Sequence, residues 1–266
     1  RELLVQGPVL NVWRAPIANE LARWGIAEAE WWRVAGLDQL RHQVQDMTVS
    51  KLSPQAVQIK IRSVSFARRP GQTFRNQYTY TVLATGDIFL THDVTPELDE
   101  LPWLPKIGLQ MRVSDELRQV DWYGRGPFET YPDRKTGAKI GFHSKAASEF
   151  FVPYYVGTDY GNLTEVRWIA LRGQDVGLAV FAEPEINASV HEFENLDRVV
   201  YPYQLRKARG LILNLDHRVT GVGDTPVTVR PEFRTYPDRY VYSVRLRPYS
   251  PARENPLQLS KQRFKY

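Results

Sequence analysis

Residues 240–247 read Tyr-Val-Tyr-Ser-Val-Arg-Leu-Arg, and apolar side chains alternate in this stretch more clearly than in any other. Successive side chains of a β-strand point to opposite faces of the sheet. One face of this stretch would therefore carry Tyr, Tyr, Val and Leu, and the other would carry Arg245 and Arg247. The alternation predicts a strand with one buried face.

The same period of two recurs upstream, and turn-forming residues separate the repeats. The alternating stretches are residues 57–61, 78–82, 107–113 and 211–215. The turn signals are Gly71-Gln72, Gly86-Asp87, residues 124–127 and residues 236–238. A single helix is expected from about Glu20 to Leu40, where apolar residues recur at helical spacing, and Gly36 would interrupt or cap it. Many strands and one early helix predict an all-β fold, a large antiparallel sandwich.

No break in composition and no internal repeat divides residues 1–248, which are expected to form one domain. Beyond them three prolines, Pro248, Pro251 and Pro256, lie in a polar stretch. We expect residues 249–266 to form a tail or linker packed on the surface. The chain opens on Arg1 without an initiator methionine, which suggests an excised segment or a processed product.

The composition excludes several classes of function. There are no cysteines, so disulfides, thiolate zinc sites and a cysteine nucleophile are excluded. The net charge is +5, but the basic residues are scattered among acidic and aromatic ones, so no nucleic-acid partner is expected. No apolar run approaches the roughly 18–20 residues of a membrane span, so no membrane partner is expected either. The lack of cysteine does not choose a cellular compartment, because cytoplasmic and periplasmic proteins can both lack it.

The titratable residues show no catalytic or metal-binding spacing. The acidic candidates are Glu129, Asp133, Asp159, Glu165, Glu183, Glu185, Glu192 and Glu194. The histidines are His42, His92, His143, His191 and His217. No two of these histidines are spaced as metal ligands, and no acidic pair is specified as the two carboxylates of a glycosidase. We therefore predict no catalytic residue and no metal site in this segment.

Several segments together resemble the C-terminal domain of β-galactosidases in glycoside hydrolase family two. The most specific is residues 122–135, which read Trp-Tyr-Gly-Arg-Gly-Pro-Phe-Glu-Thr-Tyr-Pro-Asp-Arg-Lys. The others are residues 13–20 (Trp-Arg-Ala-Pro-Ile-Ala-Asn-Glu), residues 32–38 (Trp-Arg-Val-Ala-Gly-Leu-Asp), Gly161-Asn162, residues 166–168, residues 213–216 and residues 221–223. They occur in the family's order, between about Gly7 and Leu246. The domain that they resemble is the small-chain domain, the fifth of the family's enzymes.

The resemblance implies a galactose-mutarotase-like super-sandwich that forms a wall of the substrate pocket. The catalytic carboxylates would sit on a TIM-barrel domain, in the same chain or a partner chain, and the substrate would be a β-galactoside or a related sugar. The residues expected next to the substrate are Asn19, Glu20, Asp224, Thr225 and Pro226. They belong to two loops, residues 19 to about 29 and residues 224–227. The loop at residues 224–227 lacks the tryptophan on which sugar stacks in the lac-type members. No cofactor is expected in this segment, and any Mg²⁺ or Na⁺ would be bound by other domains.

The residues of the motif at positions 122–135 are expected to be structural rather than to touch sugar. They are Gly124, Gly126, Glu129, Tyr131, Asp133 and Arg134. The glycines would adopt backbone conformations closed to other residues. Glu129 and Arg134 would satisfy backbone groups or each other, and Asp133 would supply turn chemistry.

The leading hypothesis is a C-terminal domain or small subunit of a β-galactosidase-like hydrolase, inactive alone. One alternative is a stand-alone aldose epimerase, which needs a His acid and a Glu base aimed at the sugar. His143 or His191 could serve, and a catalysed interconversion of galactose anomers would favour this class. The other alternative is a carbohydrate-binding module, which micromolar binding of galactose or lactose would favour.

Overall fold

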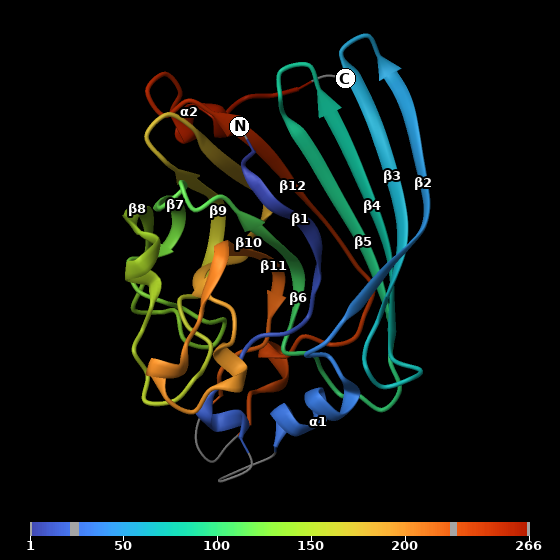
Figure 1. Cartoon of the computed structure of the whole chain (residues 1–266), viewed down its shortest axis with the longest axis vertical. Coiled ribbons are helices and arrows are strands. Elements are labelled where there is room, and N and C mark those ends of the chain that lie inside the picture. Colours follow the sequence, from blue (N-terminus) through green and yellow to red (C-terminus); the bar gives the residue numbers. More distant parts are fainter. Residues whose placement is uncertain (1, 22–26, 224–227, 265–266) are drawn as a thin grey trace.

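The fold is an antiparallel β-sheet that curls around one large core (Figure 1). The computed structural model describes residues 2–21, 27–223 and 228–264. Within these residues the strands are β1 (Leu4–Asn11), β2 (Arg41–Ser53), β3 (Ala56–Phe66), β4 (Thr73–Leu83), β5 (Ile88–Glu97), β6 (Lys106–Val113), β7 (Gln119–Gly126), β8 (Lys139–Ala146), β9 (Leu163–Arg172), β10 (Gly177–Phe193), β11 (Lys207–Val219) and β12 (Tyr240–Tyr249). The expected all-β antiparallel class is confirmed, and every predicted strand is present.

The strand order is β1-β6-β11-β10-β12-β5-β4-β3-β2, with a branch at β10. The 17 residues of β10 serve two partners on one side, because residues 177–183 pair with β12 and residues 187–193 pair with β11. On its other side β10 pairs with β9, which leads to β7 and then to the edge strand β8. β2 is the edge strand at the opposite end.

The curl brings strands together that are far apart in this order. The Leu10 N–H in β1 donates to the Tyr78 hydroxyl in β4 at 3.0 Å, inside the core. β12 shows the predicted alternation, since Tyr242, Val244 and Leu246 are buried in this core. Arg245 lies on the opposite face, and the C-terminal segment buries it there as well.

That C-terminal segment contains a short helix, α2 (Pro256–Ser260), which packs on the outer face of the sheet. Leu259 of α2 is buried, and its carbonyl oxygen accepts a hydrogen bond from Arg245 at 2.6 Å. Residues 249–266, the expected tail, are thus in contact with the sheet as far as they are described.

The other α-helix, α1 (Glu28–Ala35), is shorter than predicted, and the expectation of a start at Glu20 was wrong. Residues Ala18–Glu20 form one separate 3₁₀ turn, η1, and Leu21 after it is extended with φ −93° and ψ 140°. The backbone therefore leaves the helical conformation at Leu21. Gly36 ends α1 at φ 77°, as its predicted capping role requires.

Four more 3₁₀ turns lie in the connections between strands. They are η2 (Ala147–Phe150), η3 (Leu196–Arg198), η4 (Pro202–Gln204) and η5 (Pro231–Phe233). In the part of the chain that the structure describes, no helix is long and apolar enough to cross a membrane.

Candidate functional site

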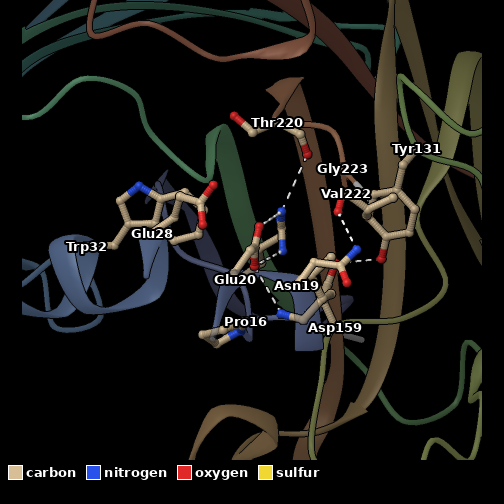
Figure 2. A network of polar contacts seen from close by, with 12 residues as sticks. Pro16, Asn19, Glu20, Glu28, Trp32, Tyr131, Asp159, Thr220, Val222 and Gly223 are labelled. Atoms are coloured by element: carbon tan, nitrogen blue, oxygen red, sulfur yellow. Dashed lines mark hydrogen bonds and ion pairs between the residues drawn. The ribbon is translucent and has the colours of Figure 1, made fainter. Parts of the chain in front are cut away.

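A hollow of about 1100 Å³ opens at the loops near α1, where several of the quoted motifs meet. Its lining comes from η1, the loop after β7, the loop before β9, the segment between β11 and η5, and η5 itself. The lining residues are Ile17, Ala18, Asn19, Glu129, Tyr131, Asp133, Arg134, Tyr154, Tyr155, Val156, Thr158, Asp159, Val222, Gly223, Thr228, Arg230 and Phe233. Figure 2 shows the network of polar contacts on one side of this hollow.

An ion pair beneath the hollow holds η1 in place. The guanidinium of Arg14 donates to both carboxylate oxygens of Glu20, at 2.9 and 2.5 Å, and both side chains are buried. Glu20 also accepts from the backbone N–H of Ile17 at 3.0 Å. Burial raises the pKa of Glu20, and the charge of Arg14 opposes that rise. Breaking such a buried pair on one side leaves an uncompensated charge, so the pair fixes the loop that carries Asn19.

Asn19 joins η1 to the segment after β11. Its side-chain amide donates to the carbonyl oxygen of Val222 at 3.1 Å (Figure 2). The backbone N–H groups of Val222 and Gly223 in turn donate to the two carboxylate oxygens of Asp133, at 2.9 and 2.8 Å. Asp133 thus connects the motif of residues 122–135 to the loop that leads into residues 224–227.

The other acidic residue of that motif, Glu129, is also fully engaged. It accepts from Arg134 at 3.3 Å, from the Tyr154 hydroxyl, and from the backbone N–H of Gly161 at 2.8 Å. The turn at Pro132 is closed by backbone hydrogen bonds in both directions between Tyr131 and Arg134. These contacts hold the wall of the hollow in one shape.

A buried tyrosine and aspartate complete the network. The Tyr131 hydroxyl donates to Asp159 at 2.9 Å, and both residues line the hollow (Figure 2). Burial raises the pKa of Tyr131 well above its ordinary value, and the charge of Asp159 raises it further. Tyr131 therefore stays a hydrogen-bond donor at any working pH.

Of the residues expected next to the substrate, one lines the hollow, one does not, and three lie outside the described residues. Asn19 lines the hollow. Glu20 does not line it, because its carboxylate is bound to Arg14 and the residue is only 5% exposed. Asp224, Thr225 and Pro226 lie outside the described residues, although Gly223 and Thr228 on either side of them line the hollow.

The reason expected for Gly124 and Gly126 was wrong. Both lie in β7 rather than in a turn, and neither has the positive φ found at Gly36. A side chain at Gly124 would bring its Cβ to 2.9 Å from the Cα of Val166, and one at Gly126 would bring its Cβ to 2.8 Å from the ring of His143. Close approach of neighbouring strands therefore explains these glycines.

Some lining residues have no sequence signal that would have singled them out. Arg230 precedes η5, Phe233 is its last residue, and Tyr155 is 97% exposed at the rim. Asp159 belongs to the acidic candidates, but its partner Tyr131 is 28 positions away. No three His, Cys, Asp or Glu side chains of the described residues converge as a metal site would require.

A comparison with protein families identifies the family of this chain. Residues 1–246 match the family model described as beta galactosidase small chain. This chain belongs to the β-galactosidase small chain family. The resemblance seen in residues 122–135 and the other motifs is thereby confirmed.

Curated relatives of this small-chain domain are much longer proteins. The β-galactosidase of Priestia megaterium strain DSM 319 is 31% identical over 255 residues, which cover 93% of this chain and 24% of the relative. The β-galactosidase of Vibrio vulnificus strain CMCP6 is 30% identical over 266 residues, with the same two coverages. The chain therefore spans about a quarter of the length of these relatives.

Solved structures with a similar fold are more distant. An α-mannosidase from Enterococcus faecalis V583 has a TM-score of 0.49 at 10% identity, over 80% of this chain and 23% of the other. A GalM/aldose epimerase homologue from C. elegans has a TM-score of 0.42 at 14% identity, over 77% and 69%.

Proposed function

We propose that this small-chain domain forms one wall of a β-galactoside site in a larger glycoside hydrolase. A TIM-barrel domain, in the same or a partner chain, would supply the nucleophile and the acid/base carboxylate. A retaining or inverting glycosidase needs two carboxyl groups free to act on the glycosidic bond. Any Mg²⁺ or Na⁺ would be held by those other domains.

The observation that carries the proposal is that the carboxylates in the hollow already accept hydrogen bonds from the protein. Among the described residues these are Glu129, Asp133 and Asp159. Glu129 and Asp133 accept backbone N–H groups, and Asp159 accepts the hydroxyl of Tyr131. Each therefore serves to shape the wall, which suits a domain that orients a sugar without cleaving it.

Exposed apolar residues at the rim of the hollow support contact with another domain. Tyr155 is 97% exposed and Val156 is 41% exposed, side by side in the chain at the edge of the hollow. Exposed apolar side chains grouped beside a concave surface mark ligand grooves or protein contacts. We expect the catalytic domain to cover this rim.

The geometry gives no support to the epimerase alternative. None of the histidines in the described residues lines the hollow. His191 is buried and donates from Nε2 to the carbonyl oxygen of Tyr160 at 2.9 Å, so it is engaged away from solvent. Burial lowers the pKa of His191, which also disfavours its use as an acid.

The first test measures hydrolysis of an aryl β-galactoside by the purified chain and by a longer enzyme that carries this segment. We expect turnover only in the longer enzyme. Hydrolysis by the chain alone would overturn the proposal.

A matched pair of variants then tests the wall itself. Arg230 is exposed and lines the hollow, whereas Arg62 is an exposed arginine on β3 that does not line it. In the longer enzyme, Arg230→Ala should raise KM about tenfold with kcat little changed, and Arg62→Ala should leave both unchanged. Equal effects of the two variants would contradict a role of the hollow in substrate binding.

A further inference from the structure

A row of aromatic side chains crosses the outer face of the sheet from β8 to β5. Each member is paired with the next across neighbouring strands, in the order Phe142, Tyr123, Trp168, Phe181, Arg245 and Phe89. Six strands thus place five aromatic rings and one guanidinium in one line. None of these residues lines the hollow described above.

The rings of this row contact one another. Tyr123 and Phe142 are stacked, with centroids 4.7 Å apart and planes inclined by 23°. The ring centroids of Phe142 and Trp168 are 6.0 Å apart. Further along, the guanidinium of Arg245 lies over the ring of Phe181, 4.1 Å from its centroid. Trp168, Phe181 and Arg245 are buried, so these contacts form a floor from which Phe142 emerges as the exposed ring.

The C-terminal segment closes one end of the row and leaves the other end open. Phe264 packs edge-on against Phe89 at 5.3 Å, and Arg245 lies 5.0 Å from the centre of its ring. At the other end Phe142 is 59% exposed. Between these ends the residues of the row line a second hollow, of about 960 Å³.

Polar groups of both signs surround the rings. Glu183 and Glu185 are exposed at the bend of β10 and line this second hollow. Arg167 lines it too, with its guanidinium 5.6 Å from the centre of the Tyr123 ring. The lining thus offers hydrogen-bond acceptors and donors beside an apolar floor.

We infer that this second hollow, on the outer face, is a carbohydrate-binding site. The C–H groups of a pyranose carry a partial positive charge and pack on the negative face of aromatic rings, here that of the exposed Phe142. Its hydroxyl groups need acceptors and donors together, which Glu183, Glu185 and Arg167 provide. The site is independent of the function proposed for the first hollow.

The charges favour a sugar over other ligands. The carboxylates of Glu183 and Glu185 would repel the phosphates of a nucleic acid. Arg167, Lys261 and Arg263, which also line the hollow, would attract them, so the lining matches neither sign of charge alone. The central part of a protein–protein contact is depleted of glutamate, aspartate and lysine, whereas Glu183, Glu185 and Lys261 line this hollow. An uncharged ligand with many hydroxyls satisfies both kinds of group.

The test follows the indole signals of the ¹⁵N-labelled chain during titration with β-1,4-galactotriose and, in parallel, cellotriose. Trp168→Phe identifies the signal of Trp168, whose ring lies in the row. We expect this signal to shift saturably with at least one of the two sugars, with a Kd of about 1 mM or tighter. The absence of any saturable shift with both sugars would overturn the inference.

Two exposed phenylalanines provide a matched control. Phe142 is 59% exposed within the row, and Phe128 is 53% exposed at a different hollow. Phe142→Ala should weaken binding about tenfold, Glu183→Gln with Glu185→Gln should weaken it further, and Phe128→Ala should leave it unchanged. Equal binding by the Phe142→Ala chain would overturn the assignment. Self-association of the chain that Phe142→Ala abolishes, without a sugar-dependent shift, would instead assign the row to protein contact.

Discussion

Asp133 is a turn residue whose side chain organises a loop 90 residues further along the chain. Its two carboxylate oxygens accept the backbone N–H groups of Val222 and Gly223 at 2.9 and 2.8 Å. Charge-assisted hydrogen bonds of this kind are stronger than neutral ones. The loop thus has its two N–H donors satisfied by one side chain, and the edge of the first hollow depends on that side chain.

Replacing Asp133 by Asn should therefore lower the free energy of unfolding by about 1–3 kcal/mol. The carboxamide keeps one acceptor oxygen, but its NH₂ group meets the second N–H donor and leaves it unpaired. Urea unfolding followed by tryptophan fluorescence measures the loss. Asp238→Asn is the control, because Asp238 is an exposed aspartate in the segment between η5 and β12. Equal stability of the two variants would mean that Asp133 does not hold the loop.

Single residues of the site were predictable only where a motif carried them. Asn19, Glu129 and Asp133 lie in stretches that resemble the family, and all three line the hollow. The roles of Glu20 and Asp159 depend on Arg14 and Tyr131, which the fold brings to them. Arg14 and Glu20 are six residues apart in one motif, but no regular element sets that spacing. Tyr131 and Asp159 are 28 residues apart and meet only because two loops come together.

The short helix α1 shows how one glycine sets the length of an element. Gly36 has φ 77° and donates its N–H to the carbonyl oxygen of Arg33 at 2.9 Å. The loop after β3 passes so close that a Cβ on Gly36 would lie 2.6 Å from the backbone nitrogen of Arg68. Both the conformation and the space exclude a side chain there.

Gly36→Ala should accordingly destabilise the chain by about 2–4 kcal/mol, through backbone strain and overpacking together. Thermal unfolding followed by circular dichroism measures the effect. Gly7→Ala on β1 is the control, since a Cβ at Gly7 would have no neighbour within 4 Å. A Gly36→Ala chain as stable as the Gly7→Ala chain would show that the loop moves away freely.

Elements were predicted well where local pattern decides them and poorly where contacts do. The alternation of residues 240–247 follows from one buried face, and β12 contains all of them. The helix expected from Glu20 fails because the carboxylate of Glu20 is bound to Arg14 and Leu21 is extended. The turn expected at residues 124–127 lies mostly in β7, since close strand packing can require glycine as well as a turn can.

At the scale of the whole molecule, the curl of the sheet encloses polar groups that must be paired. His92 of β5 lies in the core, stacked on Tyr78 at 4.4 Å and in edge contact with Tyr242 at 5.3 Å. Its Nε2–H donates to Asn76 at 3.0 Å, and its Nδ1 accepts from the Tyr242 hydroxyl at 2.7 Å. The neutral ring is therefore fully paired, on the strand next to the one whose Tyr78 also binds β1.

This buried histidine should make the fold sensitive to acid. Burial lowers the pKa of His92 from 6.5 to about 3, so the unfolded chain takes up this proton at a higher pH than the folded chain does. The contribution of His92 to stability is complete above pH 6.5 and declines as the pH falls towards 3. At pH 5 the decline amounts to about 2 kcal/mol. Urea unfolding at pH 7 and pH 5 should show a smaller loss between the two values for His92→Gln than for the unmodified chain. Identical losses would show that His92 takes up its proton in the folded chain as readily as in the unfolded one.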